Sequence, residues 1–220
     1  MSSIAQNISQ IEQEITDAAR LVAVTKTKPV AVLHETYESG FRRFGENKVQ
    51  EMVEKYNLLP KDIEWHLIGH LQTNKVKYIA PFVSLIHSVD SYKLLKEINK
   101  EAKKNDRVIC CLLQIYIASE ETKFGLSEEE AVEILSSESL ADLKNIKITG
   151  LMGMASNTAD ESQVRSEFRG LKKLSLDFRK YDAENVSIKE VSMGMSGDYL
   201  LAVEEGSTIV RVGSAIFGNR

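Results

Sequence analysis

Lys26 is the residue whose position suggests chemistry most directly. It follows the apolar run Leu21–Val24, which has the length of a buried strand, and Pro29 comes shortly after it. Poor hydration at the end of a buried strand favours the neutral, nucleophilic form of a lysine amine. Such an amine can form a Schiff base with an aldehyde cofactor. The alternative is that the Lys26 side chain only extends past the strand end into solvent.

Two segments late in the chain have the composition of phosphate-binding loops. Ser192–Asp198 reads Ser-Met-Gly-Met-Ser-Gly-Asp, and Arg211–Ser214 reads Arg-Val-Gly-Ser. Small residues let a ligand approach the backbone, and the N–H groups of a helix start bind anions together with serine hydroxyls. Each segment alone also fits a tight turn with a serine cap. The phosphate interpretation requires the Asp198 carboxylate to point away from the ligand.

Two histidines, His66 and His70, lie in the segment Trp65–Gln72 with no glutamate between them. The segment reads as a strand followed by a loop, so we predict no metal site there. His66 fits either the border of a ligand ring or a core histidine with satisfied hydrogen bonds. The methionines near the candidate loops are predicted to pack rather than to react. These are Met152, Met154, Met193 and Met195.

Short apolar runs alternate with helical patterns along the whole chain. The predicted strands are Leu21–Thr25, Phe41–Phe44, Glu64–Ile68, Val83–His87, Arg107–Tyr116, Ile146–Gly150, Ser187–Val191 and Ser207–Val212. The predicted helices are one on the stripe Ile4, Ile8, Ile11 and Ile15, then Val30–Ser39, Asn47–Tyr56, Thr73–Ala80, Ser91–Lys103, Ser127–Ser136, Thr158–Lys180 and Asp198–Glu204. Capping boxes at Ser127–Glu130 and Thr158–Glu161 are predicted to begin two of these helices.

This alternation predicts an α/β fold, a single (β/α)₈ barrel with an extra N-terminal helix. The 220 residues match the lower size range of such barrels. The alternative, a doubly wound open sheet, normally carries a Gly-rich fingerprint after its first strand, and Thr25–Pro29 has none. No linker or repeat divides the chain, so we expect one domain over residues 1–220.

The unusual residues collect where the predicted strands end, which is where such barrels place their active sites. These strand ends are Thr25–Lys26, Gly45–Asn47, His66–Gln72, His87–Asp90, Thr122–Gly125, Met152–Met154, Ser192–Gly197 and Arg211–Ser214.

Composition argues against several classes of protein. The formal net charge of -4 gives no reason to expect nucleic acid or an anionic membrane as a partner. Residues Met1–Arg20 lack the basic-then-apolar pattern typical of a signal sequence, and no apolar stretch in the sequence has the length needed to span a bilayer. The adjacent cysteines Cys110 and Cys111 would point to opposite faces of a strand, so we expect reduced thiols in a cytoplasmic protein.

Five segments of the chain stand out together: Ala23–Pro29, Phe44–Asn47, Trp65–Gln72, Ser192–Asp198 and Arg211–Gly218. They resemble, in the same order and along almost the whole chain, the motifs of the pyridoxal 5′-phosphate (PLP) homeostasis proteins of the YggS/PROSC type. The resemblance implies a single PLP-binding barrel like the N-terminal domain of alanine racemase. It also implies PLP held as an internal aldimine on Lys26. Gly153 stands where the family leads us to expect Thr or Ala, which slightly changes the predicted wall of the site.

The resemblance further implies a role for each residue of the site. Lys26 carries the aldehyde, and the two late loops take the phosphate. Arg211 faces the pyridine nitrogen; because an arginine only donates hydrogen bonds, it keeps that nitrogen unprotonated and weakens the ring as an electron sink. Asn47 and His66 border the ring or its 3′-oxygen. The predicted cofactor-binding residues are Lys26, Asn47, His66, Ser192, Met193, Ser196, Gly197, Arg211, Gly213 and Ser214.

Two hypotheses of function follow from the resemblance. The first is a non-catalytic protein that stores PLP, passes it to apo-enzymes and so takes part in vitamin B6 homeostasis. The second is a PLP-dependent amino-acid racemase, which needs a base on each face of the substrate carbon. In alanine racemases the opposing base comes from an extra β domain and a second subunit. This chain ends at Arg220, soon after the last predicted strand, so we expect no such domain, which favours the first hypothesis and no catalytic residues. We also expect a monomer, with a weak dimer as the alternative.

Overall fold

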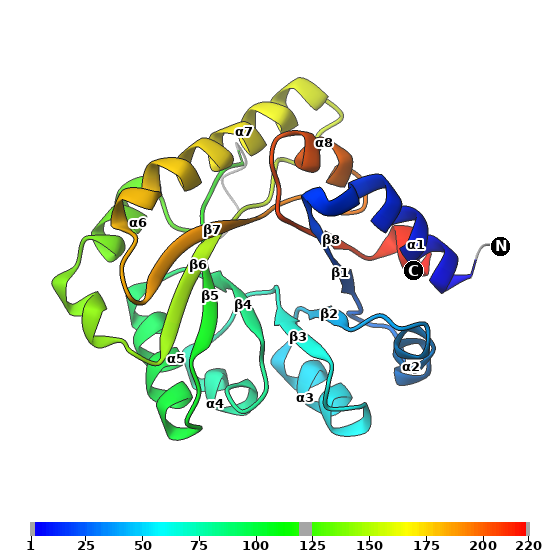
Figure 1. Ribbon diagram of the computed structural model, residues 1–220, viewed down its shortest axis with the longest axis horizontal. Coiled ribbons are helices and arrows are strands. Elements are labelled where there is room, and N and C mark those ends of the chain that lie inside the picture. The colour runs from blue at the N-terminus through cyan, green and yellow to red at the C-terminus, as the bar shows by residue number, and fades with distance from the viewer. Residues whose placement is uncertain (1–2, 119–124, 219–220) are drawn as a thin grey trace.

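The computed structural model describes residues 3–118 and 125–218, and within them eight strands close a parallel barrel (Figure 1). The strands are β1 (Arg20–Val24), β2 (Arg43–Glu46), β3 (Glu64–Leu67), β4 (Leu85–Val89), β5 (Ile109–Gln114), β6 (Ile146–Met152), β7 (Val186–Ser192) and β8 (Ile209–Val212). Each strand pairs in parallel with the next, and β1 pairs with β8 to complete the ring. The predicted (β/α)₈ barrel is confirmed.

Helices surround the barrel and bury its outer face (Figure 1). They are α1 (Ile4–Ile15), α2 (Val30–Glu38), α3 (Val49–Leu58), α4 (Val76–Ile79), α5 (Tyr92–Lys104), α6 (Glu128–Leu135), α7 (Glu161–Asp177), α8 (Tyr199–Glu204) and α9 (Ser214–Phe217). The extra N-terminal helix α1 is present, and its predicted stripe buries Ile8, Ile11 and Ile15. Helix α1 lies beside α9, where the Asn7 side chain donates to the Ile216 carbonyl at 2.8 Å (Figure 1).

Alternate residues of each strand face opposite sides of the barrel wall. Outward-facing side chains such as Phe44 and Trp65 pack in the large core between the barrel and the helices. A separate inner cluster fills part of the barrel interior; its members are Val22, Leu85, Leu112, Met152 and Ile209. This parity decides which side chains at the strand ends enter the site and which lie behind it.

Two strands, β2 and β4, each begin and end two residues later than the predicted Phe41–Phe44 and Val83–His87. The shift of β2 matters for the site. Gly45 carries no side chain, so the apolar pattern stopped before it. In the structure the glycine is required, because a Cβ there would lie 2.9 Å from Val22 Cγ1. The shift places Glu46 on the outer face and Asn47 at the cavity end of the strand.

One of the two predicted capping boxes is confirmed and one is wrong. Ser127 and Glu130 cap α6 reciprocally. Helix α7 instead begins after Asp160, whose Oδ1 accepts from the N–H groups of Ser162 and Gln163. A carboxylate at this position also interacts with the positive end of the helix dipole, which favours it over the Thr158 hydroxyl.

Two short features were not separated by the sequence pattern. The predicted helix Thr73–Ala80 consists of a 3₁₀ turn, η2 (Thr73–Lys75), followed by α4.

Among the described residues, none of the helices combines the length and the apolar character that a membrane span requires.

Candidate functional site

A cavity of about 410 Å³ opens at the C-terminal ends of the strands. Its lining comes from the ends of β1 and β8 and from the segments that follow β1, β2, β3, β6, β7 and β8. The lining residues are Val24, Lys26, Thr27, Lys28, Asn47, Ile68, Met154, Met195, Ser196, Gly197, Arg211, Gly213, Ser214 and Gly218. The structure therefore brings Lys26, both predicted phosphate loops, Arg211 and Asn47 around one space.

Three residues of the predicted set do not line this cavity. His66 and Ser192 lie deeper in the barrel interior, both buried. Met193 is fully buried in the outer core, because its neighbour Ser192 takes the inward position on β7. Thr122, Lys123 and Phe124, which the sequence also places at a strand end, lie outside the described residues.

The Lys26 turn connects β1 to α2 and projects Lys26 into the cavity. Lys26 is half-buried and lines the cavity instead of lying free on the surface. The Lys28 N–H donates to the Thr25 carbonyl at 3.0 Å and closes the turn. Thr27, between them, has a φ of 65°, a left-handed conformation that is rare for a β-branched residue. Lys28 Nζ lies 3.3 Å from the carbonyl oxygens of Phe217 and Gly218, so it is held at the end of α9.

The two phosphate-loop candidates meet at Ser196. Its Oγ accepts a hydrogen bond from the Gly213 N–H at 3.0 Å and from the Ala215 N–H at 3.4 Å. Backbone donors at the start of α9 thus converge on an oxygen atom at the edge of the cavity. A Cβ at Gly197 would meet nothing within 4 Å, so this loop leaves open space beside those donors. The site fits an anionic oxygen group such as a phosphate.

The Asp198 carboxylate lies in the same loop as this anion site. Its Oδ1 accepts from the Met195 N–H at 2.6 Å, so the carboxylate turns back onto its own loop. Asp198 is also absent from the cavity lining. Its carboxylate therefore points away from the anion site, as the phosphate interpretation requires.

Arg211 is buried at the floor of the cavity, and its guanidinium is held by two acceptors. Nη1 donates to Ser192 Oγ at 2.5 Å, and Nη2 donates to the Gly153 carbonyl at 3.1 Å. Within the described part of the chain no carboxylate forms an ion pair with it. Burial lowers the pKa of Arg211 to about 10, so it remains protonated near neutral pH.

Two histidines continue this hydrogen-bonded chain into the barrel. Ser192 Oγ lies 2.9 Å from His87 Nδ1, and His87 Nε2 lies 2.9 Å from His66 Nδ1. Burial lowers the pKa of His66 to about 3, and burial also lowers that of His87. Because Arg211 can only donate, Ser192 Oγ must accept from it, and neutral histidines allow the hydrogen bonds to run on in one direction. His66 is therefore placed as a hydrogen-bonded interior residue behind Arg211.

Gly153 does not shape the wall of the cavity as expected. A Cβ built there would lie 2.8 Å from both Ile117 Cδ1 and Leu171 Cδ2, in the packing outside the strand ends. A side chain at this position would press on the ends of two apolar side chains and not on the cavity, so the expectation that Gly153 changes the wall of the site was wrong. Its carbonyl is what reaches the site, through Arg211.

Sequence reasoning missed a buried ionic group behind the Lys26 turn. It contains Glu46 on the outer face of β2 and Lys55 on α3, whose atoms Oε1 and Nζ are 2.7 Å apart. One sequence signal pointed to it, the spacing of Glu51 and Lys55 by one helical turn.

Comparisons with known proteins agree with this geometry. The model of the family described as "Alanine racemase, N-terminal domain" matches residues 1–220. A pyridoxal phosphate homeostasis protein of Aquifex aeolicus is 43% identical over 206 residues, covering 93% of this chain and 88% of the relative.

Two solved structures extend the comparison. PipY of Synechococcus elongatus, solved with PLP bound, superposes with a TM-score of 0.89 at 32% identity, covering 98% of this chain and 100% of that one. An alanine racemase of Bartonella henselae gives a TM-score of 0.77 at 17% identity, covering 98% of this chain and 58% of that one, which shows a shared fold.

Proposed function

Because this chain belongs to the family of pyridoxal phosphate homeostasis proteins, whose domain is the alanine racemase N-terminal domain, we propose that it carries PLP on Lys26 without catalysing a reaction. One observation carries the proposal. A lysine amine, a convergent set of backbone N–H donors and a buried guanidinium line a single cavity. PLP offers a matching aldehyde, phosphate and ring nitrogen.

Each group of the cavity takes one part of the cofactor in this proposal. When bound, PLP supplies an electrophilic aldehyde attached to an electron-withdrawing ring. Lys26 holds it covalently through its amine, and Asn47 borders the ring. Arg211, held by Ser192 and the Gly153 carbonyl, offers the ring nitrogen a donor and no acidic proton. The phosphate is taken by Ser196, Gly197, Gly213 and Ser214.

The make-up of the cavity supports storage over catalysis. Among the described residues that line it there is no histidine, tyrosine, cysteine or carboxylate. Lys28 is the remaining amine, and it donates to the carbonyls at the end of α9. A racemase needs a base on each face of the substrate carbon, and this lining supplies none beyond the lysines. We propose that residues 1–220 act as one PLP-binding domain, as a monomer, and that apo PLP enzymes receive the cofactor.

The test begins with the attachment site. The protein is loaded with PLP, reduced with borohydride, digested and mapped by mass spectrometry. We expect the cofactor on Lys26 and its loss in Lys26→Ala. Lys48→Ala, an exposed lysine next to Asn47, serves as the matched control and should retain it. Cofactor found on Lys28 in the wild-type protein would contradict the assignment.

Function is tested with the same holo-protein in two assays. One measures α-proton exchange of L-alanine in deuterated water, and the other measures reactivation of an apo-transaminase. We expect exchange slower than about 1 s⁻¹, the lower end of ordinary turnover numbers, together with reactivation of the apo-enzyme. Faster exchange would favour the racemase.

A further inference from the structure

The backbone on both sides of Lys26 is held from behind by a buried ion cluster. We use this name for Thr25, Glu46, Glu51 and Lys55, which lie between β1, β2 and α3. The side chains of Glu46 and Lys55 are 0% and 5% exposed, and that of Glu51 is 23% exposed. Within the described part of the chain, no residue of the buried ion cluster lines the cavity itself.

The residue before Lys26 is held at two points. Lys55 Nζ donates to the Thr25 carbonyl at 2.7 Å, and the Thr25 hydroxyl donates to Glu46 Oε1 at 2.5 Å. The residue after Lys26 is held as well, since the Thr27 N–H donates to Glu51 Oε1 at 2.6 Å. These bonds fix the direction in which the backbone presents the Lys26 side chain.

Lys55 joins the two holds into one unit. Its ammonium has three donors, and they go to Thr25 O, Glu46 Oε1 and Glu51 Oε1, the last at 2.6 Å. Glu51 therefore contacts Thr27 directly and contacts Thr25 through the Lys55 ammonium. Glu51 and Lys55 are both on α3, so the helix and the turn are tied together.

Stability alone gives a poor account of this arrangement. A buried ion pair is often no more stable than apolar residues of similar volume. Among the described residues, Glu46 Oε2 is buried without a hydrogen-bond partner, which adds a further cost. Thr27 adds backbone strain at its φ of 65°. Structures keep destabilising features of this kind mainly at functional sites, where they fix the positions of the functional groups.

We propose that Glu51 and Lys55 are positioning residues for Lys26, and that they govern covalent capture of an aldehyde rather than binding of the phosphate. This inference rests on the proposed function. In the capture step the Lys26 nitrogen forms a double bond to the aldehyde carbon, and the aldehyde oxygen leaves as water with both amine protons. The phosphate loops belong to β7 and β8, on elements that the buried ion cluster does not include.

The experiment separates capture from phosphate binding by using two ligands. PLP carries the aldehyde, and pyridoxine 5′-phosphate carries an alcohol in its place. Glu51→Ala removes the acceptor for the Thr27 N–H and for Lys55, whereas Glu51→Gln keeps an oxygen acceptor. Glu54→Ala, an exposed glutamate on the same helix, is the matched control. Dissociation constants for both ligands and the unfolding midpoint of each variant are measured.

We expect Glu51→Ala to weaken PLP binding by about tenfold or more, as for the loss of a hydrogen bond to a charged group. Pyridoxine 5′-phosphate should bind Glu51→Ala as it binds the wild type, and Glu51→Gln should restore most of the PLP affinity. Unchanged PLP affinity in Glu51→Ala would overturn the inference, as would an equal loss for both ligands. If the wild-type protein failed to bind PLP, the proposed function itself would be contradicted, and not only the role of Glu51 and Lys55.

Discussion

Two buried polar assemblies lie on opposite sides of the barrel wall, and each supports a different residue of the cavity. Outside the wall, the buried ion cluster holds the backbone around Lys26. Inside the wall, the chain from His66 through His87 and Ser192 holds the Arg211 guanidinium. Both occupy positions where apolar side chains would normally pack.

The two assemblies solve the problem of buried charge in different ways. The outer one places a cation against carboxylates, with Lys55 Nζ within 2.7 Å of Glu46 Oε1. Desolvation nevertheless raises the pKa of Glu46, so this compensation is incomplete. The inner one holds the Arg211 cation without a carboxylate in direct contact among the described residues, while the charge of Asp198 acts on it from a distance. It keeps its histidines neutral. The residues that support Lys26 are charges of opposite sign in contact with each other. The residues that support Arg211 are uncharged.

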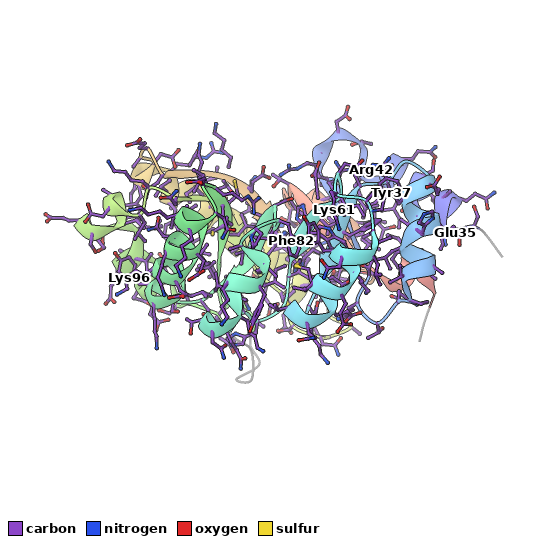
Figure 2. All side chains as sticks on the ribbon, turned by 90° about the horizontal axis from the view of Figure 1, so that it is seen from below. Glu35, Tyr37, Arg42, Lys61, Phe82 and Lys96 are labelled. Atoms are coloured by element: carbon purple, nitrogen blue, oxygen red, sulfur yellow. The ribbon has the colours of Figure 1, made fainter. Side chains whose placement is uncertain are left out.

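A cluster of Tyr37, Arg42 and Asp62 on the outer surface shows how similar charged groups behave when water can reach them. Figure 2 looks onto the face formed by α2 to α5, where Tyr37 and Arg42 are labelled side by side. The Arg42 guanidinium lies 3.7 Å from the centre of the Tyr37 ring and pairs with Asp62, 2.9 Å away. Both this cluster and the buried ion cluster contain an ion pair, but the side chains of Arg42 and Asp62 are 35% and 56% exposed, so water already solvates them.

The largest effect is expected from removing the cation of the outer assembly. Lys55→Met leaves Glu46 buried without its partner, which should lower the free energy of unfolding by about 3–5 kcal/mol. Equilibrium unfolding in urea measures the loss. The double variant Glu46→Leu/Lys55→Met should recover part of it, because the uncompensated charge is gone. A loss below about 1 kcal/mol, the range of surface ion pairs, would show that the buried ion cluster is solvated.

The second largest effect is expected from His66→Leu in the inner assembly, on the pH dependence of the free energy of unfolding. The unfolded chain protonates His66 near its usual value of 6.5, whereas the folded protein keeps it neutral down to about 3. The unfolded state thus binds more protons between these values, so stability falls as the pH falls, by about 1.4 kcal/mol per pH unit for one histidine. His66→Leu should reduce this slope by that amount in urea unfolding between about pH 4 and 5.5. His34→Gln, an exposed histidine, is the control, and equal slopes in all three proteins would contradict the burial of a neutral His66.

The smallest effect is expected at the exposed cluster. Asp62→Asn removes the partner of Arg42, but the groups are solvated and screened by salt. Its unfolding midpoint should match that of Glu54→Gln, another exposed carboxylate on this side of the molecule. A clear loss of stability in Asp62→Asn alone would weaken the contrast between the buried and exposed clusters.

The sequence was informative where a local pattern determines the structure. Alternation of apolar runs and helical periods predicts the barrel, and strand ends predict that Lys26, Ser196 and Arg211 approach one another. The pattern was uninformative about which side of the wall a polar residue faces. Glu46 was not recognised because Gly45 interrupts the apolar alternation of β2, and Met193 was placed at the site because strand parity near a loop is ambiguous.

Contacts between distant segments could not be predicted at all. The bond between His66 and His87 and the bond between Ser192 and Arg211 depend on the stagger of four different strands. The link from Lys55 to the Thr25 carbonyl depends on how α3 packs against β1. Such pairings are set by tertiary packing, for which a single sequence carries no local signal.

The closure of the barrel between β1 and β8 has a consequence for how the protein matures. Lys26 follows the first strand, while Gly213 and Ser214 follow the last, so the cavity straddles the seam where the two ends of the fold meet. During synthesis the seam cannot close before the ribosome has released β8, and pairing across such a sequence distance is slow. A ligand that contacts both edges binds the closed ring alone and adds to its stability by mass action. A cofactor bound at this seam would therefore stabilise the closed barrel against separation of β1 and β8.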